Sequence, residues 1–147
     1  MVGIFEIITS NPVINVSLIS WFVAQMLKFL YDYMQTGRFD FLRFMSGSGG
    51  MPSSHSAVVC AVCVTVFKVA GWESVEFGLA LILAMVVMYD ASGVRRAAGE
   101  HARVLNTLME KWSDPEGLEK ELKELLGHTP FEVLAGAVLG ISIALLL

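Results

Sequence analysis

Apolar residues gather into four stretches of the chain, at about residues 13–33, 54–70, 75–90 and 131–147. The last three are slightly short against the about 20 residues that a helix needs to cross a bilayer, but such helices can cross where the bilayer thins. The pattern therefore predicts an all-α fold, a polytopic membrane helical bundle with about four transmembrane helices.

The long connection over residues 91–130 is polar, and its first part has helical periodicity. One helical face of residues 94–112 collects His101 and the apolar side chains Val94, Ala97, Ala98, Leu105, Leu108 and Trp112. The segment Ser113-Asp114-Pro115 predicts the start of a further amphipathic helix, which Gly127 ends. We expect these amphipathic helices to lie at the membrane interface, within a single domain that covers residues 1–147.

Composition and charge support a membrane location. The chain of 147 residues is 55% hydrophobic and 16% charged, whereas soluble domains are about 25% charged. The net charge of −4 leaves no basic patch with interleaved aromatic residues, so the expected partner is the lipid bilayer and no nucleic acid. Four spans place the loops 34–53 and 91–130 on one side. Of the ten Lys and Arg residues only Lys68 falls on the other side, which predicts a multi-pass protein with its polar face in the cytoplasm.

The segment 47–56, with the sequence Gly-Ser-Gly-Gly-Met-Pro-Ser-Ser-His-Ser, leads into the second apolar stretch. Glycine allows close backbone approach to a ligand, and the free amides at a helix start attract anions. Ser53 and Ser54 are therefore candidates for phosphate binding. His55 can exchange a proton with a bound anion near neutral pH.

His128 and Glu132 stand at the start of the fourth stretch, and their spacing has two interpretations. Thr129 and Glu132 can form a capping box with Pro130 in the first helical turn. Alternatively, Glu132 orients His128 and raises its basicity, as an acid does for a histidine that acts as a nucleophile or base. The spacing leaves both open.

Further candidates are charged residues at the ends of the apolar stretches. Arg95 and Arg96 follow the third stretch and suit bidentate phosphate binding, although Arg96 can also pair with Glu100 along a helix. Asp90 can pair with an arginine or with Lys28, or ligate a metal ion. Because no second carboxylate has metal-ligand spacing, we expect an ion pair and no metal. A lysine inside a span, such as Lys28, faces a wet cavity or extends to the headgroups.

These residues together resemble the divergent, small branch of the phosphatidic-acid phosphatase type 2 superfamily, whose members are described as acid phosphatase/vanadium-dependent haloperoxidase-related. Lys28 and Arg38 match the first superfamily motif, and Pro52-Ser53-Ser54-His55 matches the second, with Ser54 in place of glycine. His128-x3-Glu132 matches the end of the third motif, with Glu for Asp. Leu122 stands where that motif has an arginine, and Arg95 or Arg96 could supply the missing charge.

The resemblance implies a helical membrane phosphatase that hydrolyses a lipid phosphate or polyprenyl diphosphate through a phosphohistidine, with no metal or other cofactor. His128, held by Glu132, would be the nucleophile, and His55 would be the general acid. The phosphate-binding residues would be Lys28, Arg38, Ser53, Ser54, Arg95 and Arg96, supported by Asp90 and Glu100.

A different class of function is also open. A non-catalytic membrane protein that binds lipid headgroups or anions, or a small subunit of a transport assembly, would explain the low number of spans and the missing arginine. Four short spans barely enclose a site, so we also expect a homodimer or larger homo-oligomer.

Overall fold

The computed structural model describes residues 10–37, 50–112, 122 and 127–147, and these residues form helices and no strands. The helices are α2 (Pro12–Thr36), α4 (Ser54–Ala70), α5 (Val75–Ser92), α6 (Val94–Trp112) and α7 (Pro130–Leu146). Each of the four predicted spans coincides with one helix, and the first amphipathic segment is α6. The all-α prediction is thus confirmed, while the predicted helix after Ser113 lies outside the described residues except for Leu122.

Short polar side chains start these helices. The side chain of Asn11 accepts hydrogen bonds from the Val13 and Ile14 amides, at 2.9 and 3.3 Å, and so caps α2. Ser53 caps α4, Ser74 caps α5 and Thr129 caps α7 in the same manner. Each cap satisfies an amide that has no partner inside its own helix, so the local sequence determines where the apolar helices begin.

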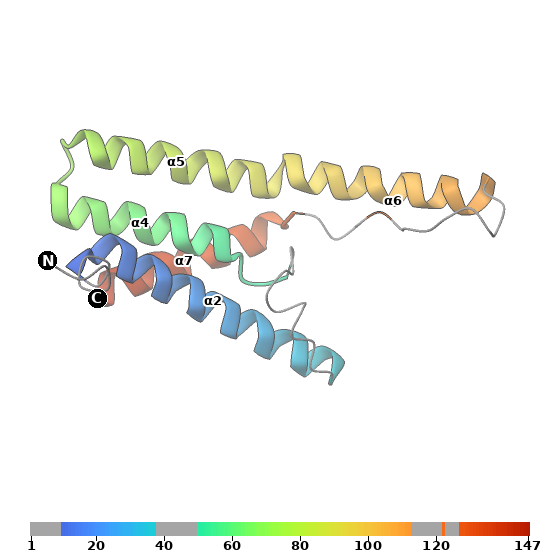
Figure 1. Cartoon of the computed structure of the whole chain (residues 1–147), viewed down its shortest axis with the longest axis horizontal. Helices are drawn as coiled ribbons and strands as arrows, with labels where there is room; N and C mark the ends of the chain where they lie inside the picture. The colour runs from blue at the N-terminus through green and yellow to red at the C-terminus, as the bar shows by residue number, and fades with distance from the viewer. Residues whose placement is uncertain (1–9, 38–49, 113–121, 123–126) are drawn as a thin grey trace, which may run out of the picture.

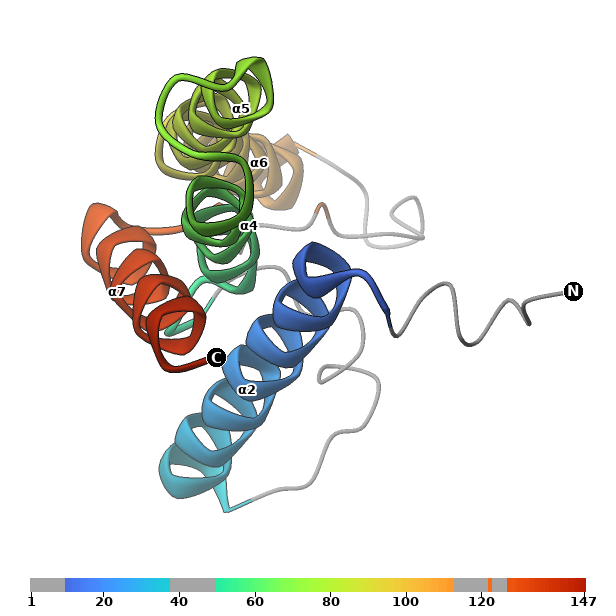
Figure 2. The same ribbon diagram turned by 90° about the vertical axis from the view of Figure 1, so that its left-hand side faces the viewer.

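Helix α4 lies at the centre of the bundle. It packs against α7, α2 and α5, which surround it in the end-on view of Figure 2. Helix α6 continues the direction of α5 away from the bundle (Figure 1) and, among the described helices, packs only against α5. The two chemistry-bearing helix starts, those of α4 and α7, therefore lie within the packed part of the molecule.

The buried residues are small, and the large apolar residues point outward. Ala24, Ala57 and Ala61 are fully buried, and Ser20, Ser53 and Ser56 share the interior. By contrast, Leu79 on α5 is 67% exposed and Phe131 on α7 is 65% exposed. A soluble protein buries its large apolar side chains, whereas helices in a bilayer can expose them to lipid and pack through small residues.

Helices α4 and α7 approach each other through their backbones. A Cβ atom added to Gly136 would collide with the Ser53 carbonyl oxygen, and one added to Gly140 would collide with the Ala57 carbonyl oxygen. Such contact is typical of membrane helices that pack through small residues. It holds the start of α7 in a defined register against the start of α4.

Two helical stretches are long and apolar enough to cross a membrane by length and composition, Pro12–Met34 and Val75–Met109. Helices α4 and α7 are apolar but have 17 residues each. Together with the outward-facing apolar side chains, these helices form a helical membrane bundle, as the sequence predicts. At the end of the bundle away from the site, the Lys68 ammonium donates a hydrogen bond to the Ala144 carbonyl oxygen at 3.0 Å and caps α7.

Candidate functional site

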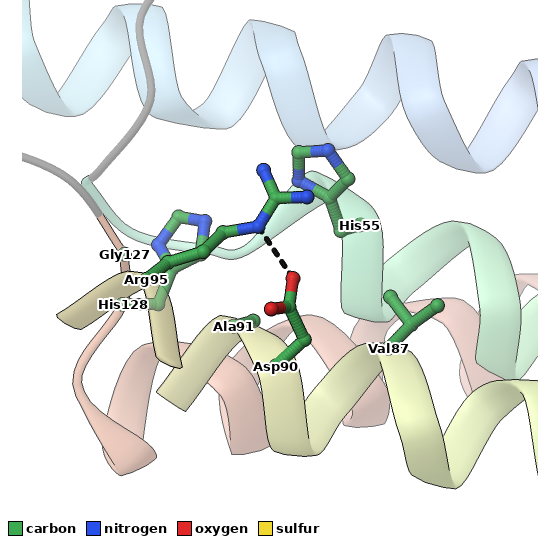
Figure 3. A pocket seen from close by; sticks show the side chains of 7 residues that line it. All are labelled: His55, Val87, Asp90, Ala91, Arg95, Gly127 and His128. Carbon is green, nitrogen blue, oxygen red and sulfur yellow. Dashed lines mark hydrogen bonds and ion pairs between the residues drawn. The ribbon is translucent and has the colours of Figure 1, made fainter. Parts of the chain in front are cut away.

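The site lies where the starts of α4 and α7 meet the end of α5. The Ser53 amide donates to the Glu132 carbonyl oxygen at 3.0 Å, and the His128 amide donates to the Ala91 carbonyl oxygen at 2.9 Å. A pocket opens at this junction, and Figure 3 shows the side chains around it. It is lined by His55, Val87, Asp90, Ala91, Arg95, Gly127 and His128.

His128 is the most enclosed of the ionisable side chains that line the pocket, with 4% of its surface exposed. Its Nδ1 atom lies 3.3 Å from Oε2 of Glu132. Since an ionised carboxylate can only accept, we assign the proton to Nδ1, which leaves the lone pair on Nε2. Burial lowers the pKa of His128 below its ordinary value of 6.5, and the Lys28 charge adds to this effect, while Glu132 opposes it. A neutral imidazole with a free Nε2 can act as a nucleophile.

Glu132 fulfils both roles that its spacing allows. Its Oε2 atom accepts the Thr129 amide at 2.9 Å, and the Thr129 hydroxyl accepts the Glu132 amide at 3.3 Å, which completes the capping box. The same Oε2 atom contacts His128. Both contacts therefore share one carboxylate oxygen, and the cap holds the acid in place beside the histidine.

His55 occupies the second position of α4 and is more open to solvent than His128. The centroids of the two imidazole rings lie 6.4 Å apart with an angle of 55° between the ring planes. This separation is too long for a direct hydrogen bond between the two rings. The second histidine therefore lines the same pocket as the first without contacting it by a hydrogen bond.

Lys28 on α2 lies near the site, although it does not line the pocket. It is only 6% exposed, and its aliphatic stem lies beside Gly50, since a Cβ atom there would meet its Cγ, Cδ and Cε atoms at 3.6 to 3.8 Å. Its charge lowers the pKa of His128, which indicates that its ammonium is close to the site. Of the two interpretations of this lysine, the structure favours the one in which it faces the protein interior.

The two neighbouring arginines lie in different surroundings. Arg95 lines the pocket, and its Nε atom forms an ion pair with Oδ2 of Asp90. Arg96 does not line the pocket, and its Nε atom lies 3.4 Å from Oε1 of Glu100, one helical turn away. The expected ion pair of Asp90 is therefore present and involves an arginine. The structure brings Arg95 and Asp90 to the histidines and leaves Arg96 and Glu100 on the outer side of α6.

The polar groups of Ser53 are already engaged in holding the structure. Its amide binds Glu132, and its hydroxyl accepts the Ser56 amide at 3.4 Å and the Ser56 hydroxyl at 3.1 Å. The first-turn amides of Ser54 and His55 have no hydrogen-bond partner among the described residues. Such amides at a helix start are suited to an anion, so backbone groups of α4 fit phosphate better than the Ser53 side chain does.

Gly127 is a site residue that the sequence reasoning treated only as a helix stop. It has a φ of +87°, and a Cβ atom there would collide with the backbone of Arg95 and Arg96. Only glycine combines this conformation with this approach. Gly127 thus locks the chain before His128 against the chain that carries Arg95. The arginines and the glycine are separated by about 30 positions in the sequence, which gives no signal of the contact.

Arg38, the remaining predicted phosphate ligand, lies outside the described residues, as do Gly47, Ser48 and Gly49 of the glycine-rich segment. Among the described residues, no group of three or more His, Cys, Asp and Glu side chains could hold a metal ion.

Comparison with known proteins establishes the family. Residues 9–143 match the model of the Divergent PAP2 family. A relative from Bacillus subtilis (strain 168), the uncharacterized membrane protein YuiD, is 39% identical over 154 residues, which cover 97% of this chain and 96% of the relative. No solved structure matches this chain. The chain belongs to the Divergent PAP2 family, as the resemblance of its motifs indicates.

Proposed function

We propose that the protein is a membrane-embedded phosphatase that hydrolyses an amphiphilic phosphate, a lipid phosphate or polyprenyl diphosphate, through a phosphohistidine. The observation that carries the proposal is the pair of histidines across one pocket, with ring centroids 6.4 Å apart, one held by a carboxylate and the other accessible. Membership of a PAP2-related family supports a phosphatase-related chemistry.

In the first step, the Nε2 lone pair of His128 attacks phosphorus and forms a P–N bond. The P–O bond to the leaving group breaks, and a protonated His55 donates its proton to the departing oxygen. Glu132 accepts the hydrogen bond from Nδ1 and stabilises the positive charge that develops on the ring. This chemistry needs no metal ion.

In the second step, water attacks the phosphorus of the phosphohistidine. His55, now neutral, takes a proton from this water, the P–N bond breaks, and inorganic phosphate leaves with His128 neutral again. Charge on the phosphoryl oxygens is stabilised by Lys28, by Arg95 and by the free amides at the start of α4. Such preorganised donors usually make the largest contribution to catalysis.

The surroundings of the pocket favour an amphiphilic substrate. Val87 and Ala91 form its apolar wall on α5, and large apolar side chains cover the outer surface of the same helix. A phosphate attached to a hydrocarbon chain can bind with its headgroup among the charged residues while its chain remains in lipid.

The test is phosphate release by purified protein in mild detergent from a panel of lipid phosphates and prenyl diphosphates. We expect release from wild type, inhibition by orthovanadate, and none from His128→Ala, with Arg103→Ala on α6 as a control for the loss of a cation. Denaturation in alkaline detergent with labelled substrate should trap an acid-labile, alkali-stable phosphoprotein in His55→Ala but not in His128→Ala. Equal release from wild type and His128→Ala would overturn the proposal.

The proposal includes a cytoplasmic site in a homo-oligomer. Nine of the ten Lys and Arg residues belong to the predicted polar side, Lys68 being the exception. Labelling of a cysteine at position 48 in sealed vesicles, with Cys60 and Cys63 replaced by Ala, tests the orientation, and exclusively external labelling would contradict it. A monomeric mass in mild detergent would contradict the oligomer.

A further inference from the structure

The ion pair between Asp90 and Arg95 joins residues that a regular helix would keep apart. Positions five apart on an α-helix point in directions about 140° apart, whereas positions three or four apart share a face. The pair forms because α5 ends at Ser92 and α6 begins at Val94. Gly93 between them has φ −106° and ψ −85°, outside the helical region.

Gly93 is also the residue that the break requires. A Cβ atom at this position would lie 2.9 Å from the Tyr89 carbonyl oxygen, a distance that real Cβ atoms essentially never show. A larger residue would therefore shift the junction of α5 and α6. The position of Arg95 relative to Asp90 depends on this junction.

The Asp90 carboxylate binds one edge of the guanidinium and leaves the other free. The contact is made through Nε, and the two terminal nitrogens of Arg95 have no hydrogen-bond partner among the described residues. Figure 3 shows the guanidinium extending toward His55, with the Asp90 carboxylate below it in this view. Two terminal N–H groups directed at one place are suited to two oxygens of a phosphate.

The backbone of Arg95 is restrained as well. Gly127 lies directly against the backbone of Arg95 and Arg96, and the next residue, His128, donates its amide to Ala91 on α5. The arginine is thus held at its backbone by the segment that carries His128 and at its guanidinium by Asp90.

We propose that Asp90 is a positioning residue, which holds Arg95 so that its terminal nitrogens bind the phosphoryl group between His55 and His128. This inference rests on the proposed phosphatase function. It adds the residue that positions Arg95, the arginine that would supply the charge missing at Leu122. Asp90 itself touches no substrate. Because the pair is partly exposed, with 49% and 37% of the two side chains accessible, it contributes little to folding stability.

The experiment is a double-mutant cycle with Asp90→Ala, Arg95→Ala and the double variant, each measured for kcat/KM and for the Kd of orthovanadate. Loss of one preorganised donor lowers the rate by about 100-fold or more, so we expect that order for Arg95→Ala and about 10-fold for Asp90→Ala. The double variant should be no worse than Arg95→Ala alone. Asp90→Glu should recover part of the loss, while melting temperatures stay close to wild type.

Two controls accompany the cycle. Arg103→Ala removes another cation of α6 and should change neither quantity. Asp90→Asn keeps the side-chain volume and serves if Asp90→Ala does not fold.

The outcomes separate this inference from the proposed function. If the losses in kcat/KM of the two single variants multiply in the double variant, or if Asp90→Ala has the wild-type kcat/KM, the positioning role would be overturned. The proposed phosphatase function would still stand. Tighter vanadate binding by Asp90→Ala would also overturn it, since Asp90 would then compete with phosphate for Arg95. If the protein has no turnover but the Kd values of orthovanadate follow the expected cycle, the positioning role of Asp90 would be supported and the phosphatase function would be rejected. A wild type that neither turns over nor binds vanadate would overturn both.

Discussion

The starts of α4 and α7 are built from the same parts and place a histidine in opposite ways. Each begins with a hydroxyl cap, Ser53 or Thr129. His55 follows its cap and stands in the first helical turn, exposed, whereas His128 precedes its cap, is buried and contacts Glu132. A histidine before the cap is fixed by the capping box, while one after the cap remains accessible. The comparison teaches that placement before or after the cap separates a histidine held by the capping carboxylate from one left exposed to solvent.

The largest expected effect separates the two histidines by leaving group. His55→Ala should lower phosphate release from an alkyl phosphate by about 10²- to 10⁴-fold, the usual contribution of a general acid. With p-nitrophenyl phosphate, His55→Ala should still release a burst of p-nitrophenol, because that phenolate leaves without a proton, while steady phosphate release stays slow because His55 also takes the proton from water. His128→Ala should abolish both reactions. Rapid-mixing assays of the two substrates check this, and a His55→Ala variant without the p-nitrophenol burst would remove the assignment of His55 as the acid.

The next effect concerns the contact that sets the two helix starts against each other. Gly136→Ala places a methyl group on the Ser53 carbonyl oxygen and should lower the free energy of unfolding by about 2 kcal/mol or more. The matched control is Gly78→Ala on α5, where an added Cβ meets nothing within 4 Å and should stabilise by up to about 1 kcal/mol. Thermal unfolding in detergent measures both, and equal melting temperatures would contradict the close contact.

A smaller effect tests the shared carboxylate of the α7 start. Glu132→Gln keeps a capping residue but removes the carboxylate charge that counteracts the lowering of the His128 pKa by burial. We therefore expect kcat to fall by about 10-fold. Thr129→Ala should instead lower stability by about 1 kcal/mol, with a smaller effect on kcat. Measurements of kcat and melting temperature for both variants decide the matter. A larger loss of kcat in Thr129→Ala would indicate that Glu132 acts only as a cap.

The smallest effect is on the pH dependence. The pKa of His128 is lowered in the folded protein, so the unfolded chain binds a proton near pH 6.5 while the folded chain does not. The contribution to stability is therefore present above pH 6.5 and is lost as the pH falls toward the folded pKa. Between pH 7.5 and pH 5 the free energy of unfolding should fall less in His128→Asn than in wild type. The same pH dependence of the free energy of unfolding in both proteins would contradict a lowered pKa of His128.

Part of the candidate site could be predicted because its residues are close in sequence. His128 and Glu132 are one turn apart, and Ser53 and His55 share one helix start, so local spacing was enough to single them out. The choice between Arg95 and Arg96 could not be made in this way. Adjacent residues on a helix point about 100° apart. The helix break at Gly93 and the ion pair with Asp90 decide that Arg95, and not Arg96, faces the pocket. The local sequence also gives no sign that the Ser53 amide donates to the Glu132 carbonyl oxygen or that its hydroxyl accepts from Ser56.

The sequence by itself determined the elements of this protein: apolar helices, their caps, and the histidines at two of their starts. These depend on interactions within a few residues and on the transfer of apolar side chains to lipid, which act wherever the chain later packs. The tertiary structure alone decided which groups meet. The backbone contacts of Gly136 with Ser53 and of Gly127 with Arg95 join positions far apart in sequence, and they bring Arg95, His55 and His128 to one pocket. Such contacts leave no periodic pattern, because their only sequence signal is a missing side chain.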